Sequence, residues 1–205
     1  AVRAAGLTDG AVISFHHHLR DGDGVLNAVL DAVARAGLRG IHVAASAIFP
    51  VHAPLVGHMR SGVVAGLCAN FVSGPVAGAV TAGVLDRPVV LRTHGGRARA
   101  VAEGTLAIDA AFVAAPAADA MGNVSGTEGP CACGVLGYPQ CDVRAARRVI
   151  AVTDTLVAYP AAMIQIPQDR VDHVALTDSL GDAGGILSGI TRASDRAEDR
   201  AIAAA

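Results

Sequence analysis

The sequence lacks tryptophan and lysine, and aromatic residues make up only 3% of it. So few aromatic side chains argue against a surface that stacks nucleic-acid bases, and we expect no nucleic-acid partner. No apolar run approaches the roughly 18 residues that a membrane-spanning helix needs. No charged amino-terminal segment leads into a cleavable apolar stretch, as a secretory signal would. We therefore expect a cytoplasmic protein with no membrane partner.

Motifs for nucleotide chemistry and metal binding are also missing. There is no P-loop, Gly-x-Gly-x-x-Gly fingerprint or Gly-x-Ser-x-Gly elbow, which argues against kinases, nucleotide hydrolases and dehydrogenases. Three of the four cysteines lie close together, but the spacing Cys131-Ala-Cys133 is tighter than in zinc knuckles. We expect reduced thiols and no bound metal.

What the sequence has is an alternation of short apolar runs with helical patterns. Its 205 residues are 52% hydrophobic, and alanine and valine dominate, which suits a buried parallel sheet with closely packed helices. We expect strands at 11–15, 41–45, 63–67, 89–93, 110–115, 149–153 and 171–176. We expect helices at 24–38, 54–60, 75–85, 97–103 and 140–146. This order predicts an α/β fold: a mainly parallel open sheet flanked by helices on both faces.

Two segments depart from this alternation. Residues 115–138 are rich in proline, glycine, asparagine, serine and cysteine, and so long an irregular segment in a compact domain usually has a function. Residues 194–205 are charged and then alanine-rich, which predicts an exposed helix. We therefore expect one α/β domain over 1–193 and a linker helix over 194–205.

The first candidate site is a run of three histidines after the first expected strand. Because side chains alternate along a strand, His16 and His18 share one face and His17 takes the other. A His-x-His pair can hold a metal if His94 or Asp119 adds a ligand, but no carboxylate–histidine pattern completes such a site. The alternative is hydrogen-bonded histidines that line a polar crevice beyond the strand ends.

A second strand-to-helix junction has the features of an anion site. Gly95 and Gly96 let the backbone approach a ligand, and free amides at a helix N-terminus attract negative charge. Arg97 and Arg99 add positive charge in the first turns, where it opposes the helix dipole. We expect both arginines to matter more for ligand binding than for stability. The alternative is a solvated basic turn.

The long irregular segment holds further candidates. Asp119, Gly122 and Asn123 either form a turn or face a ligand at the end of a strand. Glu128 is one of only three glutamates and the one placed for chemistry. The alternative for Glu128 is a solvated loop carboxylate.

Four strings together resemble the citrate lyase alpha subunits of the CoA-transferase superfamily. They are ISFHHH at 13–18, IFPVHAPL at 48–55, RTHGGRARA at 92–100 and AAPAAD at 114–119. The resemblance runs from about residue 6 to residue 191. It covers only the amino-terminal half of that family's chain, which has two similar α/β domains. It implies a CoA-transferase-like domain.

The resemblance implies a citrate CoA-transferase activity. An acetyl thioester on an acyl carrier protein (the gamma subunit) exchanges its acyl group for citrate, which gives citryl-carrier and acetate. A citryl lyase (beta) subunit then cleaves the citryl thioester. No cofactor would be tightly bound, because acetyl-CoA or the phosphopantetheine-type arm of the carrier serves as substrate. Citramalate remains open as an alternative to citrate.

The resemblance also implies roles for the candidate residues. Oriented donors must stabilise the oxyanion formed when a citrate carboxylate reaches the thioester carbonyl. His94, Arg97 and Arg99 would bind the tricarboxylate or the carrier-arm phosphate. The histidines at 16–18 and the backbone amides near Gly22 and Gly24 would face the thioester. The group Asp119, Gly122 and Asn123 would match the superfamily's loop at the cleft, and Glu128 is a further catalytic candidate.

Two other classes of protein remain open. A metal-dependent hydrolase would hold zinc or manganese on His16 and His18. A non-catalytic assembly domain would only dock the carrier and lyase subunits.

Overall fold

A computed structural model describes the chain except for residues 1, 17, 187–195, 197, 199 and 202–205. The main sheet has seven strands, all parallel, in the order β10-β8-β5-β1-β2-β3-β4. They are β1 (Val12–Phe15), β2 (Ile41–Ala45), β3 (Val64–Ala69), β4 (Val90–Leu91), β5 (Ala110–Ala114), β8 (Arg148–Thr153) and β10 (His173–Leu176). Each expected strand overlaps one of these seven strands, so the parallel α/β sheet is confirmed.

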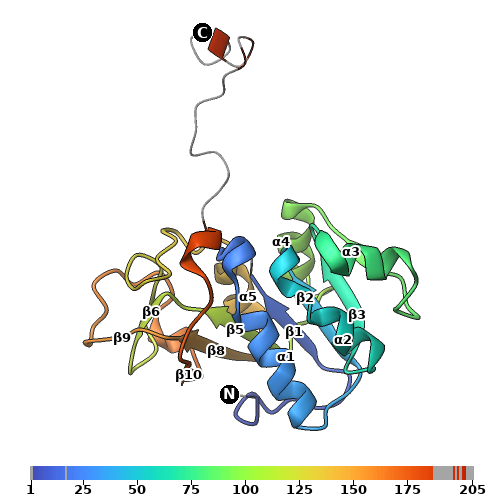
Figure 1. Cartoon of the computed structure of the whole chain (residues 1–205). Coiled ribbons are helices and arrows are strands. Elements are labelled where there is room, and N and C mark those ends of the chain that lie inside the picture. Colours follow the sequence, from blue (N-terminus) through green and yellow to red (C-terminus); the bar gives the residue numbers. More distant parts are fainter. Residues whose placement is uncertain (1, 17, 187–195, 197, 199, 202–205) are drawn as a thin grey trace.

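Helices cover both faces of this sheet (Figure 1). They are α1 (Val25–Arg35), α2 (Leu55–Arg60), α3 (Gly74–Thr81), α4 (His94–Ala102) and α5 (Pro139–Ala145). On one face, Leu26 and Leu30 of α1 pack in one apolar cluster with Phe15 and Phe112, whose rings lie 6.0 Å apart. On the other face, α4 and α5 pack against the opposite side chains of β5 and β8. No helix among the described residues is long and apolar enough to cross a membrane.

The strand order places a switch point between β1 and β5. The chain passes from β1 through β2 and β3 to β4, and then returns to lay β5 on the other side of β1. At such a point the connections leave toward opposite faces of the sheet and open a crevice beyond the carboxyl ends. The loop after β1, which carries the histidines, therefore lies at the usual place for a ligand site.

A second, three-stranded sheet was not expected. Its strands are β7 (Val124–Ser125), β6 (Ala117–Asp119) and β9 (Leu156–Val157), in that order. Two of them fall inside the segment 115–138, which is therefore partly regular. Short 3-10 helices complete the fold: η1 (Arg20–Gly22), η2 (Pro50–His52), η3 (Gln168–Arg170) and η4 (Ala183–Ile186). Most of the expected linker helix at 194–205 lies outside the described residues.

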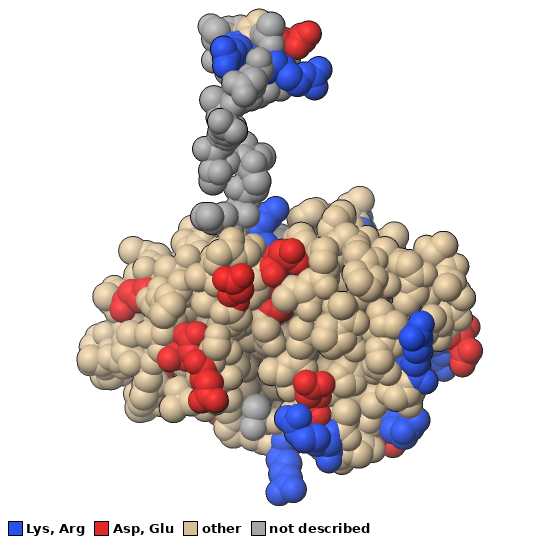
Figure 2. Space-filling model, viewed as in Figure 1, with Lys and Arg blue, Asp and Glu red and all other residues tan. Residues whose placement is uncertain are grey.

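Charged side chains form small separate groups on the face shown in Figure 2, with uncharged surface between them. The 16 basic and 18 acidic residues of the chain give a net charge of only −2. The small net charge gives the domain no strong overall field to steer a charged ligand over a long distance.

Candidate functional site

The loop after β1 turns at the carboxyl edge of the sheet and brings His18 onto β5. The Nε2 atom of His18 lies 2.6 Å from the carbonyl oxygen of Ala114, the last residue of β5. Because a carbonyl oxygen only accepts, Nε2 carries the proton and Nδ1 has the lone pair. Burial lowers the pKa of His18, and the bond to Ala114 and the charge of Asp23 oppose this shift without cancelling it. His18 is therefore a neutral imidazole near pH 7.

A cavity of about 350 Å³ opens beside this histidine. Its lining consists of His18, Arg20, Cys133, Val135, Leu136, Gly137, Tyr138, Pro139 and Ile186. Burial raises the pKa of the Cys133 thiol, so that side chain is uncharged near neutral pH. The cavity thus combines apolar walls with a neutral imidazole and a single guanidinium, that of Arg20.

The two strand-to-helix junctions lie at the same edge of the sheet. Because all seven strands are parallel, β1 and β4 both end at this edge. His94 begins α4, and its ring centroid lies 5.5 Å from that of Tyr138, which lines the cavity with His18. His94 therefore contacts a residue of the cavity wall but does not line the cavity itself.

Arg97 occupies a different place from the one we expected. It is completely buried and makes a two-pronged ion pair with Asp142 of α5, with N–O distances of 2.7 and 2.6 Å. It also donates to the carbonyl oxygen of Ala44 at 3.1 Å. Burial alone would lower the pKa of Arg97, but the bonds and charge of Asp142 raise it. The expectation that Arg97 matters little for stability is wrong. The packing of α4 against α5 buries Arg97 on Asp142, and nothing in the sequence indicated this pairing.

The same ion pair lies beside the first histidine. His16 is buried, and its Nδ1 atom is 3.6 Å from the Oδ2 atom of Asp142. Its ring stacks at 6.1 Å from the ring of His18, so these two histidines do lie side by side. His17 lies outside the described residues. Among the residues that are described, no group of three His, Cys, Asp or Glu side chains could hold a metal ion.

Arg99 and the glycines of α4 remain on the surface. Thr93 caps this helix, because its hydroxyl accepts from the backbone N–H of Gly96 at 3.1 Å. The Gly95 backbone has open space around it. Arg99 is exposed and pairs with Glu103 one turn further along, at 2.7 Å. This surface is compatible with an anion site at the start of α4, which stays a prediction.

The glycines after the histidines are used for chain packing rather than left open to a ligand. The N–H of Gly24 donates to the carbonyl oxygen of Leu180 at 2.8 Å, and that of Gly22 donates to Leu19 at 2.9 Å. A side chain on Gly22 would overlap the backbone of Asp182. The expectation that these amides face a thioester is therefore wrong: a chain segment 156 to 160 residues later covers them, and no local sequence pattern indicates this contact.

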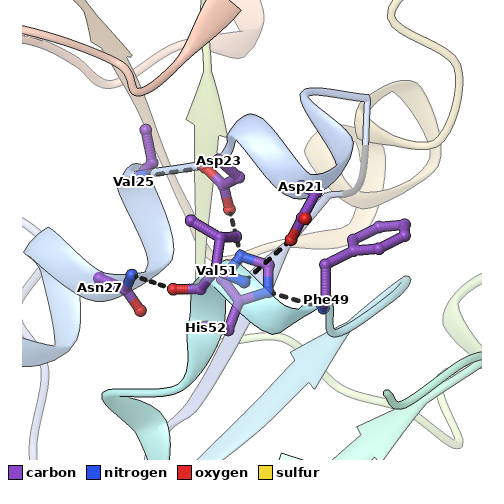
Figure 3. Close-up of polar contacts among 7 residues, drawn as sticks. All are labelled: Asp21, Asp23, Val25, Asn27, Phe49, Val51 and His52. Carbon is purple, nitrogen blue, oxygen red and sulfur yellow. Dashed lines mark hydrogen bonds and ion pairs between the residues drawn. The ribbon is translucent and has the colours of Figure 1, made fainter. Parts of the chain in front are cut away.

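A buried network, shown in Figure 3, ties the loop after β1 to the loop after β2. Asp23 accepts from the N–H of Val25 at 2.9 Å, and its other oxygen lies 3.1 Å from Nε2 of His52. Nδ1 of His52 accepts from the backbone N–H of Phe49 at 3.0 Å, so Nε2 carries the proton that points to Asp23. A further bond joins Asp21 to the N–H of Val51. The sequence singled out none of these contacts, although the acidic turn RDGDG at 20–24 marks the first loop and His52, just before Pro54, marks the second.

Asp119, Gly122 and Asn123 form a structural turn between β6 and β7. The two oxygens of Asp119 accept four hydrogen bonds, three from the turn and one from the N–H of Ala161 at 3.0 Å. The Asn123 amide also bonds to Gln168. None of the three residues lines the cavity beside His18. The expectation that they face this ligand site is wrong, because the unexpected small sheet uses their polar groups.

We expect replacement of Asp119 by asparagine to cost about 1.5 kcal/mol of stability at neutral pH, the typical contribution of hydrogen bonds to a charged group. Burial alone would raise the pKa of Asp119, but the bonds from Asn123, Ala161 and Met121 lower it below its usual value. This stabilisation is present at neutral pH and is lost as the pH falls below the usual carboxyl range. Urea unfolding at pH 7 and pH 3 should show the difference between variant and parent shrinking at pH 3. An equal difference at both pH values would contradict the prediction.

Glu128 is half-buried, and its Oε1 atom is buried without a hydrogen-bond partner among the described residues. It does not line the cavity beside His18. Its backbone neighbour Gly129 approaches the carbonyl of Pro116 and the side chain of Thr155, so this part of the loop lies at the small sheet. A catalytic role for Glu128 stays a prediction.

The seven-stranded parallel sheet, with helices on both faces, has the fold of the CoA-transferases. Glutaconate CoA-transferase from Acidaminococcus fermentans shares this fold, with a TM-score of 0.63 and 15% identity over 85% of this chain and 73% of that one. The chain belongs to the citrate lyase alpha subunit family (CitF), whose family model matches residues 1–205.

Individual relatives agree with this assignment. The chain is 40% identical to the citrate lyase alpha chain of Escherichia coli and 37% identical to that of Haemophilus influenzae, over 203 residues in each case. The alpha subunit of citrate lyase from Streptococcus mutans, solved in complex with citrate, has a TM-score of 0.92 and 45% identity over 96% of this chain and 38% of that one. The match covers 99% of this chain but only 40 to 41% of the length of these two relatives.

Proposed function

We propose that this chain is the citrate-binding part of a citrate CoA-transferase. It exchanges the acyl group of an acetyl thioester for citrate, to give a citryl thioester and acetate. The single observation that carries the proposal is the 45% identity and close structural match to a subunit that was solved with citrate. The acyl thioester is that of CoA or of a carrier protein, and no cofactor is tightly bound. The partners are the carrier (gamma) and citryl lyase (beta) subunits, in the cytoplasm.

The residues at the carboxyl edge support this chemistry. His18 is neutral and keeps a lone pair on Nδ1, so it can accept a proton or a hydroxyl hydrogen. His16 lies against it, and His94 contacts the cavity wall through Tyr138. Arg99, with the exposed start of α4 at Gly95 and Gly96, suits the phosphate of a carrier arm or CoA. We assign residues 1–193 to this α/β domain and 194–205 to a linker.

The test is a pair of measurements on the 205-residue chain. We expect citrate to bind in calorimetric titration, because the cavity belongs to this chain. We expect little or no turnover of acetyl-CoA plus citrate by these 205 residues alone, because the chain spans only 40 to 41% of its relatives and their remaining residues would help to position reactants and exclude water. Failure to bind citrate would overturn the transferase proposal. Robust turnover by this chain alone would overturn the two-part cleft.

The assembly-domain alternative makes a different prediction. A domain that only docks the other subunits would capture the carrier protein and would not respond to citrate. Replacement of His94 by alanine would then leave carrier capture and complex activity unchanged. A metal-dependent hydrolase would contain stoichiometric zinc or manganese, which elemental analysis detects.

A further inference from the structure

We propose that Arg20 is the specificity-determining cation of the cavity and pairs with a carboxylate group of the substrate. The inference rests on the proposed function, because it assigns a residue to the binding of that polycarboxylate. Arg20 lines the cavity next to His18, at the point where the chain leaves β1. Three independent features of this residue lead to the assignment.

The first feature is its backbone conformation. Arg20 has a φ of +52°, and it is the one residue other than glycine with a positive φ in the part of the chain that the structure describes. A long side chain in this region is strained, and such strain persists where the surroundings enforce it, commonly at ligand sites. Glycine would adopt this conformation freely, and the chain has 24 glycines elsewhere. An arginine here is best explained by a use for its side chain.

The second feature is the orientation of the guanidinium group. Its central carbon lies 5.9 Å from the centroid of the Phe49 ring, within the range of cation–π attraction. Phe49 is itself held, because its backbone N–H donates to His52, which bonds to Asp23. Asp23 is three residues from Arg20, so one network joins the backbone of Phe49 to the turn that carries the arginine (Figure 3). The guanidinium is therefore oriented before a ligand arrives, which reduces the entropy lost on binding.

The third feature is the charge that stays unmatched. Among the described residues, no carboxylate lies within 4.0 Å of the Arg20 guanidinium, whereas Arg97 and Arg99 each have one. The other lining side chains of the cavity are apolar or neutral. A guanidinium offers a planar pair of donors that matches a carboxylate. The positive charge of Arg20 in the cavity is therefore available to pair with a ligand, and a carboxylate is the group that matches its geometry.

The test combines citrate binding with thermal unfolding in five variants of the chain. We expect Arg20→Gln to weaken citrate binding roughly 10- to 100-fold, the loss of one charge-assisted pair. We expect Arg20→Lys to lose part of this affinity, because the lysine ammonium keeps the positive charge but lacks the planar pair of N–H donors. Arg60→Gln, an exposed arginine at the end of α2, is the matched control and should bind as the parent does.

The two remaining variants separate a ligand role from a structural one. Arg20→Ala and Arg20→Gly both remove the guanidinium, but only glycine relieves the positive φ. We expect Arg20→Gly to melt about 2–4 °C above Arg20→Ala, while both bind citrate as weakly as Arg20→Gln. A glycine variant that melts below the alanine variant would overturn the inference, because the positive φ at position 20 would then carry no strain for the ligand role to explain. Parent-like citrate binding by Arg20→Gln would overturn it as well. If the parent chain itself fails to bind citrate, the proposed function is wrong, and the role of Arg20 that rests on it is wrong as well.

Discussion

Replacement of Arg97 by alanine is expected to destabilise the fold by about 3–5 kcal/mol, the usual cost of removing one member of a buried ion pair. The variant leaves the Asp142 carboxylate at 0% exposure without its cation, and the carbonyl oxygen of Ala44 loses a donor. It also removes the ion pair that joins α4 to α5 across 45 residues of sequence. Urea unfolding at pH 7 measures the loss.

Two further variants show whether the buried charge is the cause. Arg99→Ala removes an arginine from the same helix, but its pair with Glu103 is exposed, so the expected cost is only about 0.3–0.5 kcal/mol. A double replacement, Arg97→Met with Asp142→Leu, removes both charges and should recover most of the stability. If Arg97→Ala unfolds like the parent and binds citrate less tightly, Arg97 is a ligand residue after all and the structural role is wrong.

Replacement of Gly181 by alanine is expected to release the segment 179–186 from the loop after β1. Gly181 has a φ of +143°, which other residues rarely adopt, and an added Cβ would overlap the carbonyl oxygen of Gly22. Backbone strain costs about 1–3 kcal/mol and overpacking about the same, so we expect a combined loss of about 2–6 kcal/mol. Ile186 at the end of this segment lines the cavity, so citrate binding should weaken too.

Limited proteolysis locates this effect, because a released segment is cut while the sheet stays intact. Gly57→Ala is the matched control: Gly57 lies inside α2 with open space around it, and alanine there should stabilise the chain by about 0.5–1 kcal/mol. Unchanged proteolysis and melting of Gly181→Ala would show that the segment does not need this close approach.

The main sheet was predictable because its strands have a strong local signal. A strand buried on both faces is apolar along its whole length, as β5 is, and glycine or a polar turn ends it. The helices were predictable in the same way, although α4 begins at His94, three residues earlier than the pattern indicated. The parallel arrangement followed from the alternation of strands and helices, and it placed both candidate junctions at one edge.

The small sheet was missed for the opposite reason. Its strands have two or three residues each, and β9 pairs with β6 across the whole of α5 and β8. A strand of two residues has no detectable period, and its partner is not visible in the local sequence. The polar residues of its turn, Asp119 and Asn123, therefore gave the same signal that a ligand loop would have given.

The sequence by itself determined the α/β class, the places of the seven main strands along the chain, and the edge of the sheet at which the histidines lie. These features depend on patterns that are only a few residues long. Only the tertiary structure decided which polar groups are left for a ligand. Arg97 and Arg20 are both arginines beside glycine-containing turns, yet a carboxylate 45 residues away neutralises Arg97, while no described carboxylate reaches Arg20. Burial and pairing are set by contacts between distant segments, and a single sequence does not record which segments meet.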